Sequence, residues 1–267
     1  MSLALFRHTW RSQRIRLTLV CSALAVWGFM LPLVYARYGS QLRALLDTGL
    51  LPEELMRFGG GDVFSLPGAM ALSLIHPIAI ILTSMFAVGF PAISVAGERQ
   101  RGTLEVVLAR PLSRRALYGT LAAAAVSFIG LAIAALLVGN VLGSAYAGVL
   151  GDVALERLPS LWLNAVLLFT SFAFISLAAS VSVDRLPPAL GVGIGLVVVM
   201  YFFDVLGSLW PDAAWLQPYS LFHYLQAREI LVGATHWRDL AVLAGVVTLA
   251  AAWALVVFPR RDIAAPS

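Results

Sequence analysis

The sequence contains no lysine, so all 18 of its Lys and Arg residues are arginines. A nucleotide-binding loop of the P-loop type needs a lysine that reaches the terminal phosphates, and this chain therefore cannot hold a standard site of that kind. Only one cysteine is present, Cys21, which excludes a disulfide framework within the chain. Charged residues make up 12% of the sequence, about half the share of a typical soluble domain. A membrane protein is the first interpretation.

Residues that could form a metal or hydrolase site are also few. The four histidines do not stand at ligand spacing on one helix, and no G-x-S-x-G nucleophile motif is present. Residues 53–57, EELMR, resemble the EExxxR motif of membrane CAAX proteases but are one residue short. We therefore predict no catalytic residue, no metal and no cofactor bound by this chain. The net charge of +4 comes from arginines beside apolar runs, which indicates membrane topology and not a nucleic-acid partner.

Long apolar runs dominate the rest of the sequence, which is 60% hydrophobic. Six runs have at least 20 residues each, enough to cross a hydrocarbon core of about 30 Å as a helix. They cover residues 17–36, 69–96, 116–142, 160–183, 188–210 and 239–258. Backbone groups in lipid must pair within their own segment, so runs of this length must be helices. We predict an all-α membrane protein with six transmembrane helices in a single domain over residues 1–267.

The arginines are distributed unequally between the two sides of this topology. Six spans place both termini on one side, where the segments outside the spans hold 12 arginines in 48 residues. The segments on the opposite side hold six arginines in 77 residues. Positive charge favours the cytoplasmic side, so both termini and segment 97–115 are predicted to be cytoplasmic. Leu3, Phe6 and Trp10 lie on one helical stripe, which is typical of a helix in the membrane interface; ordinary topogenic arginines are an equal alternative.

Segment 97–115, between the second and third spans, is polar yet has the pattern of a short helix. Gly102 interrupts helix propensity, Thr103 can cap a new helix, and Glu105 in its first turn complements the helix dipole. Three apolar side chains fall on one face of that helix: Leu104, Val107 and Leu108. A loop that only sets topology would need the arginines but not this face. We expect nothing else in the chain to cover the face, so the pattern indicates a partner protein.

The same residues resemble the signature of the permease subunits of type-2 ATP-binding-cassette (ABC) transporters. That pattern is G-E-R-x-x-G-T-L-E, an apolar pair and a Pro-x-Ser/Thr-Arg entry to the next helix. It is carried here by Gly97, Glu98, Arg99, Gly102, Thr103, Leu104, Glu105, Pro111, Ser113 and Arg114. The six-span order, the outer segment LQPYSLFHYLQAREILVG and the end FPRRD resemble the family as well, so the likeness covers the whole chain. The longer loop 37–68 and Arg110 depart mildly from the pattern.

The resemblance implies that segment 97–115 is a cytoplasmic coupling helix that docks on a separate ATPase. It implies two copies of an ABC ATPase carrying ATP and Mg²⁺, a second permease copy or a paralogue, surrounding membrane lipid and, as a further option, an extracytoplasmic accessory protein. It also implies an exporter in the cell membrane of a bacterium or archaeon. The residues expected to form the ATPase contact are Glu98, Arg99, Arg101, Gly102, Thr103, Leu104, Glu105 and Leu108.

A second group of residues is expected to line a substrate path or a dimer interface. Ionisable groups in a membrane are costly, which makes His76 and Asp204 candidates, although a structural or hydrated role is the stronger alternative. Pro77, next to His76, is expected to bend the second span. Gly191 and Gly195 are spaced for close packing of helices. The full set is His76, Phe86, Phe90, Gly191, Gly195, Met200, Tyr201 and Asp204.

Two other classes of function stay open from the sequence alone. The chain could be a six-helix membrane scaffold or channel without an ATPase, or, less favoured, an intramembrane enzyme. A neighbouring gene for a P-loop protein that carries the missing lysine would discriminate the transporter from the scaffold or channel. An intramembrane enzyme would need a nucleophile and a base that converge on one site, and the sequence offers no such set. Between the fifth and sixth spans, the aromatic segment 211–238 predicts a pair of short helices packed at the outer face of the membrane.

Overall fold

Six helical segments of the computed structural model are long and apolar enough to cross a membrane. The structure describes residues 2–48, 65–109, 112–234 and 237–261, and no strand occurs among them. Four of the spans lie in single helices: α1 (Leu3–Asp47), α8 (Arg114–Tyr146), α10 (Leu186–Leu209) and α12 (Trp237–Arg260). The fourth span consists of α9 (Leu158–Ser182) and the short 3-10 helix that precedes it. The predicted all-α fold with six spans is confirmed.

The second span does not begin where the sequence predicted. α3 (Leu66–Ile75) ends at His76, and a new helix, α4 (Pro77–Ser84), begins at the proline. The residue before a proline avoids the helical region, and His76 accordingly takes an extended conformation with φ −66° and ψ 141°. Its ring nitrogen Nδ1 accepts a hydrogen bond from the Ile78 amide at 3.3 Å and so caps α4. The predicted run 69–96 is therefore broken, and not merely bent, at this proline.

The rest of the second span alternates between two kinds of helix. Two π-helical turns, η1 (Met85–Gly89) and η2 (Ile93–Gly97), flank the short α5 (Phe90–Ala92). The span ends in α6 (Glu98–Gln100), and α7 (Leu104–Leu108) lies beyond a turn.

Short elements connect the later spans. They are η3 (Leu150–Asp152), η4 (Leu155–Arg157), η5 (Pro211–Tyr219), η6 (Phe222–Tyr224) and α11 (Ala227–Leu231). The described part of segment 211–238 before α12 is thus two 3-10 stretches and one short α-helix, where the sequence predicted a pair of helices.

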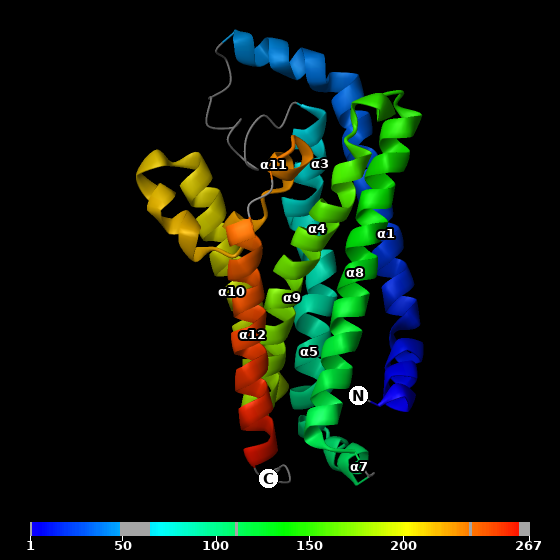
Figure 1. Ribbon diagram of the computed structural model, residues 1–267, viewed down its shortest axis with the longest axis vertical. Coiled ribbons are helices and arrows are strands. Elements are labelled where there is room, and N and C mark those ends of the chain that lie inside the picture. Colours follow the sequence, from blue (N-terminus) through cyan, green and yellow to red (C-terminus); the bar gives the residue numbers. More distant parts are fainter. Residues whose placement is uncertain (1, 49–64, 110–111, 235–236, 262–267) are drawn as a thin grey trace.

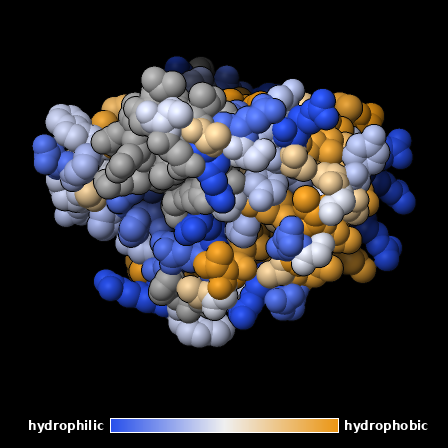
Figure 2. Space-filling model, turned by 90° about the horizontal axis from the view of Figure 1, so that it is seen from above, coloured by the Kyte–Doolittle hydropathy of each residue, from blue (hydrophilic) through white to orange (hydrophobic). Residues whose placement is uncertain are grey.

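The long helices run side by side, so that α1 begins and α12 ends at the same end of the bundle as α7 (Figure 1). We call this the terminal end, and the opposite end, toward α3 and α11, the far end. Seen from the far end, hydrophilic side chains cover much of the surface, and hydrophobic residues gather along one side (Figure 2). This distribution is expected when the ends of a bundle face water and its sides face lipid.

The first 16 residues do not form a separate interfacial helix. Residues 3–16 are the start of α1, which continues without a break to Asp47. Trp10, on the predicted apolar stripe, packs against Phe128 of α8 with ring centroids 5.3 Å apart. The stripe therefore faces the chain's own core at this position, while Leu3 remains exposed.

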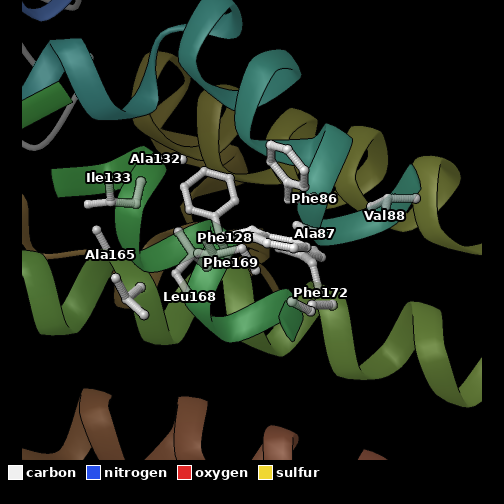
Figure 3. Packing of buried hydrophobic residues seen from close by; sticks show 14 of the residues in the cluster. Phe86, Ala87, Val88, Phe128, Ala132, Ile133, Ala165, Leu168, Phe169 and Phe172 are labelled. Atoms are coloured by element: carbon white, nitrogen blue, oxygen red, sulfur yellow. The ribbon is translucent and has the colours of Figure 1, made fainter. Parts of the chain in front are cut away.

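An aromatic cluster fills the bundle where α8 and α9 meet the second span (Figure 3). Phe128 lies 5.2 Å from Phe86 and 5.4 Å from Phe90, measured between ring centroids. Phe169 and Phe172 of α9 complete the cluster and are fully buried. Phe86 and Phe90, which the sequence assigned to a substrate path or dimer interface, are therefore buried inside the chain.

Glycines allow α1 and α8 to approach within backbone contact. A Cβ atom added at Gly139 would lie 2.1 Å from the backbone oxygen of Ala25, and one at Gly143 would lie 2.3 Å from that of Phe29. Small residues four positions apart let membrane helices pack closely, because no side chain separates the backbones. This pair holds α8 against the first span.

Candidate functional site

The second span reaches the terminal end through η2, whose backbone is opened by a side chain of α9. The hydroxyl of Ser180 donates to the Ala92 carbonyl at 3.0 Å and accepts from the Ala96 amide at 2.9 Å. In an α-helix these two backbone groups, four residues apart, would bond each other. A hydroxyl is both donor and acceptor, so it can stand between them and widen the turn. Ser180 thereby stabilises the π-helical turn from which segment 97–115 leaves the span.

Segment 97–115 reverses direction at Gly102, whose φ of +71° lies in the region that favours glycine. The carboxylate of Glu98 accepts hydrogen bonds from the Arg101 guanidinium and the Thr103 hydroxyl. Thr103 stands at the first position before α7 but forms no capping bond there. Thr103 thus occupies the predicted N-cap position, but its hydroxyl closes the turn onto Glu98 and does not cap the helix. Four of the residues predicted to contact the ATPase therefore lie together in one turn: Glu98, Arg101, Gly102 and Thr103.

The two faces of α7 differ in exposure. Leu104 is 1% exposed and lines, with residues of α1, the second span and α8, a cavity of about 210 Å³. Val106 is 67% exposed, and Glu105 is exposed beside it. The side chains of Val107 and Leu108 lie outside the described part of the structure. The expectation of an uncovered apolar face is wrong for Leu104, which anchors α7 to its own chain, while Val106 points outward.

Arg99 lies inside the protein and not on its surface. Its side chain is 3% exposed, and Nη1 donates to the Val183 carbonyl at 3.1 Å and to Asp184 Oδ1 at 3.0 Å. Arg99 therefore faces the connection between α9 and α10, which does not suit the predicted contact with an ATPase. Sequence reasoning missed Asp184. The available signal was a lone acidic residue in the short connection 184–187.

The residues predicted for a substrate path do not form one site. Tyr201 lines an apolar groove of about 450 Å³ between α4, η1 and α10. Asp204 lines a different cavity of about 220 Å³, which residues of η5, η6 and α11 complete at the far end. His76 packs against Trp27, with ring centroids 4.5 Å apart, and its side chain caps α4. These contacts agree with the structural role that was the stronger alternative for this residue. The backbone carbonyl of Met200 accepts a hydrogen bond from the Ser220 hydroxyl at 2.7 Å.

Gly191 and Gly195 lie on the outward face of α10. A Cβ atom at either position would meet nothing within 4 Å, whereas one at Gly193 would lie 2.5 Å from Val88 Cγ1. Packing within the chain therefore uses Gly193, which sequence reasoning passed over. Large apolar side chains share the outward face of α10: Val192, Ile194, Val198, Val199 and Phe202. Lipid or a second chain can cover this face.

A comparison with protein families finds a match over nearly the whole chain. The family described as "ABC-2 family transporter protein" matches residues 5–263. This range includes α7 and all six apolar spans, apart from the first residues of α1. A search of curated proteins finds no match. The family resemblance inferred from the 97–115 signature is confirmed.

Proposed function

This chain belongs to the ABC-2 family of transporter proteins, and on that premise we propose that a separate ATPase docks on segment 97–115 and drives export. In this family the membrane subunit is non-catalytic and associates with an ATPase that hydrolyses the ATP. The six apolar helices make the chain a multi-pass membrane protein. The arginine distribution supports a cytoplasmic terminal end, and the family resemblance implies the cell membrane of a bacterium or archaeon.

The exposure of α7 carries the docking proposal. Leu104 fixes this helix to the bundle, while Val106, at 67% exposure, and the charged Glu105 face outward from it. The Glu98 turn joins α7 directly to the second span, so a force on the helix passes into the span. Because the chain lacks the lysine of a P-loop, energy from ATP has to arrive through a contact of this kind.

A second copy of the chain, or a paralogue, is the proposed partner within the membrane. Gly191 and Gly195 leave room on α10 for the backbone of another helix, and only 17% of the most apolar 18-residue stretch of this helix is buried within the chain. The groove beside Tyr201 is apolar and opens between the second and fifth spans. Closing two such grooves against each other would form a path for an apolar or amphipathic cargo. The far-end cavity beside Asp204 would face an accessory protein or the released cargo.

Affinity purification with a candidate P-loop ATPase tests the docking proposal. Gly102→Val places a β-branched side chain at φ +71°, which costs about 1–2 kcal/mol and predicts roughly 5- to 30-fold weaker ATPase retention. Glu98→Ala opens the same turn and should act in the same direction. Arg37→Ala, on an exposed part of α1 toward the far end, is the control and should retain the ATPase fully.

Two outcomes would count against the proposal. If the unaltered chain retains no ATPase, the chain is a scaffold or channel. If Gly102→Val and Glu98→Ala both retain as much ATPase as the unaltered chain, segment 97–115 only sets the topology.

A further inference from the structure

One carboxylate at the terminal end holds two arginines that lie far apart in the sequence. Asp184 Oδ1 accepts from Arg99 Nη1 at 3.0 Å and from Arg261 Nη2 at 2.9 Å. Arg99 lies in α6 at the end of the second span, Asp184 joins α9 to α10, and Arg261 follows α12. The single side chain of Asp184 therefore meets parts of the chain that belong to the second, fourth, fifth and sixth spans.

Further bonds fasten the same elements. Ser180 bridges the π-helical turn η2 to α9, and the Leu186 amide at the start of α10 donates to Gln100 Oε1 at 2.8 Å. We call this set the cytoplasmic clasp, and it consists of Arg99, Gln100, Ser180, Val183, Asp184, Leu186 and Arg261. On the other side of the clasp, Arg114 of α8 donates to the Phe258 carbonyl at 3.0 Å. The end of α12 is thereby held to α8.

The position of Asp184 differs from that of the arginine it neutralises. Arg99 is 3% exposed, and its Nε and Nη2 have no hydrogen-bond partner among the described residues. Asp184 is 64% exposed and fills no space in the core. Its charge is therefore the feature of Asp184 that matters, because a buried arginine needs a counter-ion. Replacing the carboxylate by the isosteric amide removes that charge and leaves the packing unchanged.

We propose that Asp184 is the positioning residue through which motion of α7 reaches the fourth, fifth and sixth spans; this rests on the docking of an ATPase proposed above. The carboxylate lies between the end of α12, which Arg114 holds to α8, and Arg99, which lies at the end of the second span just before α7. When a docked ATPase moves α7, the ion pair carries Arg99 and the α9–α10 connection together. Without the charge, α7 still docks, but less of its motion reaches α10, because only the weaker neutral bonds of the clasp remain.

The test uses the complex of the full chain with its ATPase in liposomes, without any cargo. Spin labels are placed at Tyr146→Cys on α8 and Trp215→Cys in η5, which are 79% and 66% exposed, in a Cys21→Ala background. Pulsed electron paramagnetic resonance then compares the distance between the labels in the nucleotide-free and the ATP–vanadate state. Retention of the ATPase and ATP hydrolysis are measured on the same samples.

The variants separate a positioning role from a structural one. Asp184→Asn should keep ATPase retention and hydrolysis within twofold of the parent, while the nucleotide-dependent distance change falls at least twofold. Arg261→Gln should act likewise, and the double variant should be no worse than either, because both changes open the same clasp. Asp184→Glu should restore the distance change. The control is Arg185→Gln, because Arg185 is the exposed neighbour of Asp184. It should show the same ATPase retention, hydrolysis and distance change as the parent.

Three results would overturn the proposal. An unchanged distance response in Asp184→Asn would show that the ion pair carries no motion. Loss of ATPase retention together with the response would show that Asp184 only supports the fold. If the unaltered chain itself retains no ATPase, the docking proposal is wrong and the Asp184 proposal falls with it. This outcome is distinguishable from the other two because it is seen in the unaltered chain and not only in a variant.

Discussion

The contact between α1 and α8 offers a quantitative test of the packing. In Gly139→Ala the new Cβ would lie 2.1 Å from the Ala25 backbone oxygen, where real Cβ contacts stay beyond 3.0 Å. The obstacle is backbone, so no rotamer change can relieve it and the two helices must separate. Overpacking of this kind costs about 1–3 kcal/mol. Alanine also favours a helix over glycine by about 1 kcal/mol, which partly offsets that cost.

A matched variant removes this propensity effect. Gly119 lies in the same helix, and a Cβ there would meet nothing within 4 Å, so Gly119→Ala gains helix propensity alone. The difference between the two variants is therefore the cost of the clash, about 1–3 kcal/mol. At about 2–4 °C per kcal/mol for a chain of this size, Gly139→Ala should melt on the order of 2–12 °C below Gly119→Ala. Thermal unfolding in detergent, followed by tryptophan fluorescence, measures this difference. Equal melting temperatures would contradict backbone contact between α1 and α8.

Three further predictions concern the second span, the dimer and the orientation. Ser180→Ala removes the bridge between the Ala92 carbonyl and the Ala96 amide, and a buried unpaired group costs about 1–3 kcal/mol; the same melting assay should show a loss, and an unchanged melting temperature would mean that the turn rebonds as an α-helix. Gly195→Leu should weaken self-association in native mass spectrometry without lowering the melting temperature, since nothing in the chain lies near it; undiminished dimers would remove α10 from the interface. Cysteines at Val106 and Tyr146, which lie at opposite ends of the bundle, should react with a membrane-impermeant reagent from the cytoplasmic and the outer side, respectively, and labelling from one side would refute the proposed orientation.

The sequence predicted those features that depend on local pattern. Apolar length alone located six spans, and the glycine at position 102 indicated the turn that its φ of +71° confirms. The sequence predicted a bend at Pro77, and the structure has a break there between two helices. The position was predictable because the effect of a proline on its neighbours is local.

Features that depend on distant residues could not be predicted. The π-helical turn η2 needs the hydroxyl of Ser180, 84 residues from Ala96. The burial of Arg99 depends on Asp184, which is 85 residues away. Sequence reasoning placed Arg99 on the surface with its neighbours because nothing local distinguishes it from Arg101.

Glycine spacing shows the same limit in another form. Gly139 and Gly143 have the same separation as Gly191 and Gly195, yet only the first pair packs within the chain. The spacing predicts that a helix can approach closely, but it does not say which helix does so. Only the fold decides whether the partner is α1 or lies outside the chain.

Crosslinking from α7 tests the central proposal, docking of an ATPase on segment 97–115, most directly. A photoreactive amino acid replaces Val106, which is 67% exposed, and a control chain carries it at Tyr146, which is 79% exposed near the far end. After irradiation of membranes that contain the chain and its ATPase, position 106 should form an adduct with the ATPase and position 146 should not. Absence of the adduct at 106, or equal adducts at both positions, would contradict the proposal that α7 is where the ATPase docks.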